Sequence, residues 1–210
     1  INAQTIKALI INGASLNNIQ FPKQVSHLLN VTAGNGFVDV ENSLFSNENK
    51  ATLILEDVIS DTDLKIYPIY FPKYLLEDDL GRKKGLVKIT ATFCFSFEPL
   101  QNNQLSYNPI HMAFSFFKNH SADEINAKND DFNSKLRSTL SWSQNGRNVS
   151  KPIPFSNSQK INFTIDLNHL ISENQVLKLA IHCKVSTQII GGLPASYPKQ
   201  FPFSMAISIE

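Results

Sequence analysis

One segment constrains the fold of this chain more than any other: residues 86–97 alternate apolar and polar side chains with a period of two. Apolar side chains occupy one set of positions: Val87, Ile89, Ala91, Phe93 and Phe95. Lysine and small side chains occupy the other: Lys88, Thr90, Thr92, Cys94 and Ser96. Because successive side chains of a β-strand point to opposite faces, this pattern predicts a strand with one buried face. Such a face needs a second layer to cover it, which favours a layered β architecture.

About eight segments of the chain have the character of strands and are separated by turns rich in Asn, Ser, Gly and Pro. They cover residues 51–56, 64–71, 86–97, 110–117, 136–142, 161–165, 176–185 and 203–209. Pro68 has no backbone N–H to donate, which predicts an edge strand or a bulge for the second of them. A series of short strands of this kind predicts a mainly β fold, an antiparallel β-sandwich that is jelly-roll-like.

The first part of the chain has helical rather than β periodicity. Ile6, Leu9 and Ile10 have helical spacing within residues 4–14, with Asn2 as the N-cap, and Ile11 widens the apolar side of a helix that we expect to be buried. A second short helix is expected at 38–45, and two more at 122–128 and 131–137. A boundary near 46–50 then divides the chain into an N-terminal helical segment, 1–48, and a β-sandwich domain, 49–210.

The charge balance argues against nucleic acid and anionic membranes as partners. The chain has 19 Lys and Arg against 18 Asp and Glu, a formal net charge of +1, which leaves no basic excess to bind phosphate-rich surfaces. No apolar run approaches the roughly 18 residues of a membrane helix. The chain begins at Ile1 without an initiator Met, so we expect a piece of a longer protein, and its compartment stays unknown.

No motif for nucleophilic or metal-dependent chemistry stands out. There is no Gly-x-Ser-x-Gly elbow and no metal-ligand spacing of histidines or cysteines. The five histidines are read as surface residues or as structural residues of strands: His27, His120 and His169 in the first group, His111 and His182 in the second. We therefore assign no catalytic, cofactor-binding or metal-ligating residue and no cofactor. A triad assembled from distant residues stays open, because geometry rather than spacing defines it.

Two acidic groups could supply oxygen ligands for Ca²⁺, although solvated turns are the favoured interpretation. The first comprises Glu56, Asp57, Asp61 and Asp63, around a predicted turn, and the second comprises residues 77–79, ahead of a basic stretch at 82–84.

Cys94 and Cys183 lie on separate predicted strands, which favours buried free thiols, with a disulfide between them as the open alternative. Trp142, Tyr107 and Tyr197 are candidates for a sugar-stacking platform, although packing in the core or at its rim is favoured.

Two N-terminal stretches resemble parts of a known family. Residues 5–14, TIKALIINGA, resemble the late helix of subtilisin-like serine proteases, which follows the catalytic-serine helix and ends the catalytic domain. Residues 34–44, GNGFVDVENSL, are similar to the closing Gly-x-Gly-x-Val-x-Ala-x-x-Ala-Leu segment of that family, with Val40 and Ser43 in place of the two alanines. The strand segments 50–56, 87–93 and 203–210 are similar to the β-rich C-terminal extension of a bacterial branch.

The resemblance implies a protease parent and a non-catalytic piece. The catalytic Asp, His and Ser of the family lie upstream of the late helix, so none of them maps onto this chain. The N-terminal helices would be left over from an α/β catalytic domain, and the module would brace that domain of the same parent chain or shape substrate access. The parent would be a serine endopeptidase.

Two other functions stay open beside this one. The first is a carbohydrate-binding or adhesion module, and the second is a standalone enzyme with a dispersed active site. An exposed apolar patch on the N-terminal helices could also drive homodimerisation of the isolated fragment.

Overall fold

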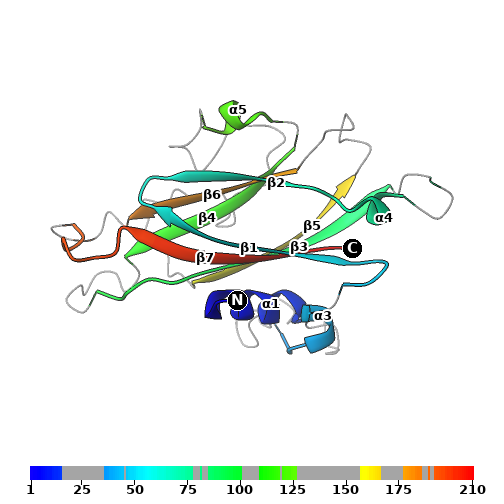
Figure 1. The fold of residues 1–210 in the computed structure, drawn as a ribbon, viewed down its shortest axis with the longest axis horizontal. Coiled ribbons are helices and arrows are strands. Elements are labelled where there is room, and N and C mark those ends of the chain that lie inside the picture. Colours follow the sequence, from blue (N-terminus) through cyan, green and yellow to red (C-terminus); the bar gives the residue numbers. More distant parts are fainter. Residues whose placement is uncertain are drawn as a thin grey trace, which may run out of the picture.

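Two antiparallel sheets lie face to face in the structure, a computed structural model of the chain (Figure 1). It describes residues 1–15, 36–44, 46–77, 81, 85–100, 109–118, 120–126, 157–166, 177–185, 189 and 192–210. The predicted strand at 136–142 and the predicted helix at 131–137 lie outside these residues. The mainly β fold and its two antiparallel sheets confirm the prediction of a β-sandwich.

The larger sheet has four strands in the order β1-β7-β3-β5, and the smaller has three in the order β2-β6-β4. The strands of the larger sheet are β1 (Ala51–Ser60), β7 (Gln200–Ile209), β3 (Leu86–Phe95) and β5 (Ser158–Asp166). Those of the smaller sheet are β2 (Leu64–Ile69), β6 (Leu177–Val185) and β4 (Ile110–Phe117). Pro68 lies in β2, an edge strand, as its missing N–H predicts.

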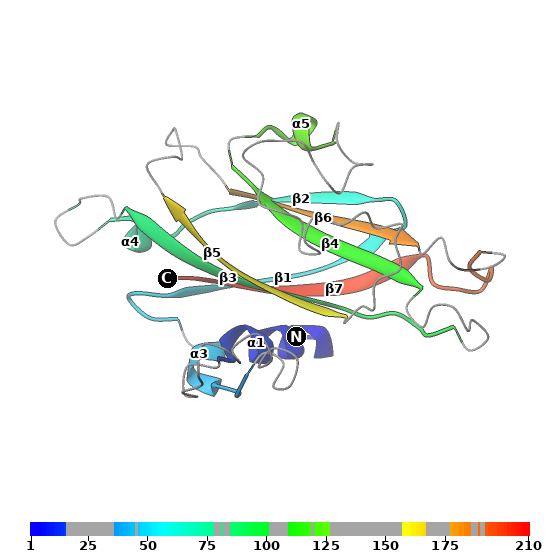
Figure 2. The ribbon, with the colours of Figure 1, turned by 180° about the vertical axis from the view of Figure 1, so that it is seen from behind.

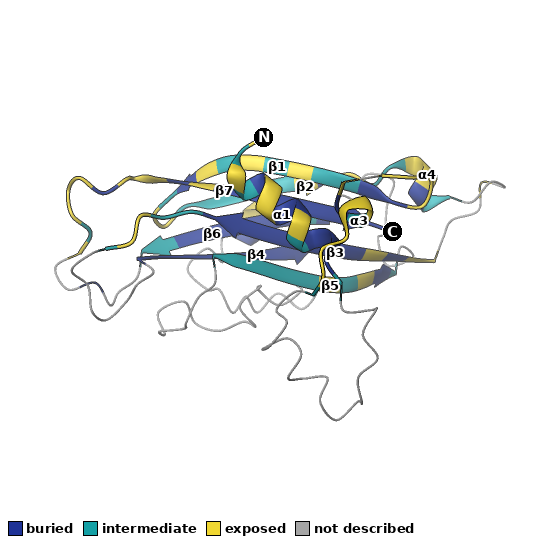
Figure 3. Cartoon of the chain, turned by 90° about the horizontal axis from the view of Figure 1, so that it is seen from below, coloured by how far each residue is buried: buried dark blue, intermediate teal, exposed yellow. Residues whose placement is uncertain are grey.

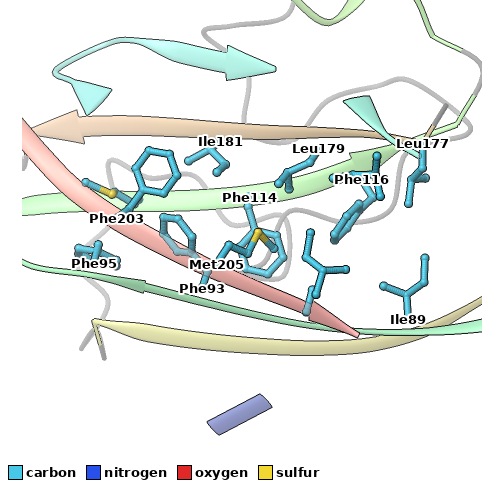
Figure 4. Packing of buried hydrophobic residues seen from close by; sticks show 14 of the residues in the cluster. Ile89, Phe93, Phe95, Phe114, Phe116, Leu177, Leu179, Ile181, Phe203 and Met205 are labelled. Carbon is cyan, nitrogen blue, oxygen red and sulfur yellow. The ribbon is translucent and has the colours of Figure 1, made fainter. Parts of the chain in front are cut away.

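The apolar side chains of the alternating segment 86–97 lie on the inner side of the larger sheet. Phe93 lies at its centre, with the rings of Phe203, Phe114 and Phe95 at centroid distances of 5.5, 5.6 and 5.7 Å. Figure 4 shows these side chains together with Met205 and with apolar residues of the smaller sheet that point toward them. Phe93 and Phe203 have no exposed surface, so the aromatic residues hold the two sheets together by burial and ring packing.

The first strand is longer than predicted. We expected it to end at residue 56 and the acidic pair Glu56 and Asp57 to flank a turn, but β1 continues to Ser60. The reason is that both carboxylates have partners in the strand conformation. Glu56 accepts hydrogen bonds from the first residues of the chain, and Asp57 accepts from Lys65 and Tyr67 at 2.8 and 2.6 Å.

In the described part of the chain, four helices lie outside the sheets: α1 (Ala3–Gly13), α3 (Val40–Leu44), α4 (Lys73–Leu76) and α5 (Ala122–Asn126). The Asn2 side chain caps α1 by accepting from the backbone N–H of Thr5 at 2.8 Å, as predicted. Figures 1 and 2 show α1 and α3 side by side on the outer face of the larger sheet, whereas α5 lies beyond the smaller sheet. The short helix α4 was not predicted.

Candidate functional site

Helix α1 lies on the outer face of the larger sheet, where the alternation of β3 places small and polar side chains. Ala8 and Leu9 pack there against Cys94 and Ala206 in a small apolar cluster. Small side chains on the sheet allow the helix to approach closely, so this contact buries Ala8 completely.

Polar residues of α1 point toward the sheet as well. Thr5 is fully buried, and its hydroxyl lies 2.9 Å from the hydroxyl of Ser204 and also donates to the carboxylate of Glu56. Hydrogen bonds from the Thr5 hydroxyl and from the backbone N–H of Asn2 lower the pKa of Glu56. The first turn of α1 is therefore anchored to β7 and β1 by hydrogen bonds.

Asn12 repeats this arrangement about two helical turns further along α1. With the amide oriented as its neighbours require, its nitrogen donates to the carbonyl of Thr90 at 3.2 Å and to the hydroxyl of Thr92 at 3.0 Å. Its oxygen accepts from the hydroxyl of Ser208 at 2.6 Å. Asn12 is only 4% exposed. These hydrogen bonds therefore replace the hydrogen bonds to water that its amide loses on burial.

The C-terminal end of α1 is closed by Lys160 of β5. Its ammonium group donates to the carbonyl oxygens of Ile11, Asn12 and Ala14 at 2.8, 3.1 and 2.7 Å. A helix C-terminus carries unpaired carbonyls and partial negative charge, which a cation satisfies. Lys160 thus uses all three of its N–H groups on the helix.

The opposite side of α1 exposes isoleucine side chains to solvent, beside the exposed Lys7, contrary to the expectation of a buried helix. Ile6 is 52% exposed and Ile10 is 39% exposed. Helix α3 and the residues before it add more apolar surface: Phe37, Val38, Val40 and Leu44 are all between 55 and 62% exposed. We call these six residues the apolar face, and Figure 3 shows the outward sides of α1 and α3 as exposed.

Helix α3 is held against α1 by close contact. The amide of Asn42 donates to the carbonyl of Gly13 at 3.0 Å, and Gly13 has no room for a side chain because Ser43 lies directly over it.

A polar cleft of about 330 Å³ opens beside this junction, between the end of α1 and the outer face of the larger sheet. Three lysines line it, and we call it the lysine cleft: Lys50, Lys88 and Lys160. The register of the sheet sets its floor, because Thr90 of β3 lies opposite Asn162 of β5 and Ser208 of β7. Glu210 supplies a carboxylate, whose oxygen lies 2.9 Å from the ammonium of Lys88.

The charges of the lysines in the cleft affect one another's pKa. Burial lowers the pKa of Lys160, and the charges of Lys88 and Lys50 lower it further. Burial also lowers the pKa of Lys50, while the carboxylates of Glu210 and Asp39 act in the opposite direction. The ammonium of Lys50 donates to the backbone and side-chain oxygens of Asn42. The sequence analysis did not predict this cleft. The one local indication of it was Lys88, which occupies a polar position of residues 86–97.

The predicted structural histidines are buried in strands. His111 and His182 are each 4% exposed, and burial lowers the pKa of His111 to about 4. His120 was predicted to be a solvated surface residue. It is only partly exposed, and its Nδ1 lies 2.7 Å from the carbonyl oxygen of Lys118. His27 and His169 lie outside the described residues.

Both cysteines are free, as favoured from the sequence. Cys94 lies beneath α1, whereas Cys183 lies in the core between the sheets. Burial raises the pKa of both thiols, for Cys94 to about 11.

The acidic groups considered for Ca²⁺ are not gathered into a site. In the described part of the chain, no three His, Cys, Asp or Glu side chains are placed to hold a metal ion. Burial acts to raise the pKa of Asp57, but its hydrogen bonds from Lys65 and Tyr67 hold it below the usual value. Glu77 lies 3.6 Å from Lys73, and residues 78–80 lie outside the described residues.

The three aromatic candidates do not form a described platform. Tyr197 is only 8% exposed and its hydroxyl donates to the carbonyl of Glu98, which places it at the rim of the core. Trp142 and Tyr107 lie outside the described residues.

No helix in the described part of the chain has the length and hydrophobicity to cross a membrane. No protein-family model matches the sequence. Among curated proteins, the chain is 25% identical over 121 residues to "Uncharacterized protein y4bN" of Sinorhizobium fredii, which covers 54% of this chain and 26% of that protein. The chain thus spans about a quarter of the length of this relative.

Among solved structures, the VP2 subviral particle of infectious bursal disease virus aligns with a TM-score of 0.35 and 7% sequence identity. The alignment covers 76% of this chain and 32% of that chain. A likeness of this size assigns neither fold family nor function.

Proposed function

We propose that this chain is a non-catalytic β-sandwich module whose apolar face docks on a neighbouring domain of the same protein. The observation that carries the proposal is the orientation of α1. A surface helix normally buries its aliphatic side chains and exposes its polar ones. Here Thr5 and Asn12 are buried while Ile6 and Ile10 face solvent, so the apolar side of α1 is free to contact a second body.

The neighbouring domain that we propose is the catalytic domain of a subtilisin-like serine endopeptidase. The two stretches that resemble the end of that domain include α1 and α3, and they pack on each other through Gly13 and Asn42. In this proposal, peptide-bond hydrolysis belongs to the parent, and the module braces the catalytic domain or shapes access to it.

Further support comes from the size of the relative. The region similar to this chain is a minor part of the y4bN protein, as expected of a module within a larger chain.

We further propose a jelly-roll arrangement of the sandwich. Successive described strands from β1 to β7 alternate between the larger and the smaller sheet, and every pairing among them is antiparallel. Alternation of this kind is characteristic of a jelly roll, in which eight strands form two sheets. The predicted strand at 136–142 is the candidate for the eighth.

The proposal is tested first on the chain alone and on its gene. The chain by itself should not hydrolyse casein, and the coding sequence upstream of Ile1 should contain a Gly-Thr-Ser turn within a few dozen codons. Hydrolysis that is blocked by a serine-directed inhibitor would contradict the non-catalytic role.

The docking surface is tested in the full-length parent. Ile10→Asp should lower the melting temperature of the catalytic domain, because it places a charge in the interface. Tyr70→Asp is the matched control, since Tyr70 is 69% exposed and lies outside the apolar face. Equal effects of the two substitutions, or none, would show that the apolar face is not the interface.

A further inference from the structure

We infer that the lysine cleft binds a small oxyanion of the phosphate or sulfate type. The inference rests on the cleft itself and is independent of the neighbour that covers the apolar face.

The charges around the cleft are unbalanced. Among the side chains of the lining, Lys50, Lys88 and Lys160 contribute three positive charges and Glu210 contributes one negative charge. Asp39 acts on Lys50 from outside the lining, and the carbonyls at the end of α1 offset part of the charge of Lys160. A positive excess remains, and like charges held this close repel one another. A bound anion would relieve that repulsion.

The three lysines have different parts in the proposed site. Lys160 has all three N–H groups on α1 carbonyls, so it contributes charge alone. Lys50 donates to two oxygens of Asn42 and is 6% exposed, which leaves one N–H for a ligand. Lys88 pairs with the carboxylate of Glu210, and its side chain is 57% exposed. Lys88 is therefore the principal donor.

Neutral donors complete the lining. The hydroxyls of Thr90 and Ser208 and the amide of Asn162 line the floor of the cleft. Hydroxyl and amide groups together with ammonium groups are the usual partners of tetrahedral oxyanions. The volume of about 330 Å³ accommodates such an anion with part of its hydration shell or a small polar substituent.

The geometry also identifies a competitor within the protein. The ammonium group of Lys88 donates to the carboxylate of Glu210 at 2.9 Å. An incoming anion must therefore share Lys88 with this carboxylate or displace the carboxylate. Removal of the Glu210 charge should therefore strengthen binding, whereas removal of the Lys88 charge should weaken it. These opposite signs distinguish a built site from general attraction to a basic surface.

Isothermal titration calorimetry with inorganic phosphate at constant ionic strength tests the inference. The wild-type chain should bind one phosphate saturably, in the millimolar range or tighter. Lys88→Gln should weaken binding about fivefold or more, and Glu210→Gln should tighten it by about the same factor. Both side chains are partly exposed, and circular dichroism will show whether each variant is folded.

Lys199→Gln provides the matched control. Lys199 is exposed and lies beside the first residue of β7, whereas Ser208 of the cleft lies near the last, roughly 25 Å along the strand. This control removes the same charge and should leave phosphate affinity unchanged. The absence of saturable binding to the wild type, or an equal loss in Lys88→Gln and Lys199→Gln, would overturn the inference.

Discussion

Gly13 offers the sharpest test of how α1 and α3 are packed. A side chain added at this position would place its Cβ 2.2 Å from the Oγ of Ser43, 2.5 Å from its backbone nitrogen and 2.6 Å from its Cα. Two of these three atoms belong to the backbone of α3, so a rotamer change of Ser43 cannot relieve the contact. We predict that Gly13→Ala destabilises the protein.

The size of the effect follows from two opposing contributions. A Gly→Ala substitution at a helical position ordinarily stabilises by about 1 kcal/mol, because alanine restricts the unfolded chain and favours the helix. Forcing an extra methyl group into a close-packed contact costs about 1–3 kcal/mol. Because the contact is with backbone atoms, we expect the upper part of that range and a net loss of about 1–2 kcal/mol.

Urea denaturation followed by circular dichroism measures the difference. Gly85→Ala is the matched control, since a Cβ at Gly85 meets no atom within 4 Å. It should leave the free energy of unfolding unchanged or raise it by less than about 1 kcal/mol. If Gly13→Ala stabilises the protein as much as Gly85→Ala, α3 is not seated against α1 and the apolar face is not a single surface.

Three further predictions concern buried polar groups. Lys160→Met should lower the free energy of unfolding by about 2–3 kcal/mol in urea denaturation, because three carbonyls of α1 lose their donor. His111 is buried with its pKa lowered to about 4. The neutral His111 side chain makes its full contribution to the free energy of unfolding above pH 6.5, and this contribution is lost as pH falls toward 4. In thermal melts, the free energy of unfolding should therefore fall by up to about 3 kcal/mol over this pH range, and by less in His111→Leu. Tyr67→Phe removes a donor to Asp57 and should cost about 1 kcal/mol in urea denaturation, with no change for Tyr74→Phe on the surface.

Much of the sandwich could be predicted because the evidence for a strand is local. The alternation in residues 86–97 correctly placed Val87, Ile89 and Phe93 in the core, since neighbouring side chains of a strand point to opposite faces wherever the strand lies. The N-cap role of Asn2 was predictable for the same reason, because it concerns Asn2 and Thr5 alone.

The lysine cleft could not be predicted in this way. Lys50 precedes β1, Lys88 lies on β3 and Lys160 lies on β5, so they are far apart in sequence. Only the order β1-β7-β3-β5 and its register bring them to one end of α1. A sequence pattern does not contain the pairing of distant strands, and a cluster that depends on it is therefore invisible before the fold is known.

By itself, the sequence determined where most strands lie and which of their faces are apolar, together with the extent of α1. The rotation of α1 about its own axis was decided by tertiary structure. Helical spacing placed Ile6, Leu9 and Ile10 on one inward face, but of these only Leu9 is buried. The outer face of the sheet offers Thr92, Ser204 and Ser208 as hydrogen-bond partners. The helix turns Thr5 and Asn12 toward them. If isoleucine side chains covered these three hydroxyls instead, the hydroxyls would be buried without partners, which would cost more than leaving two isoleucines in water.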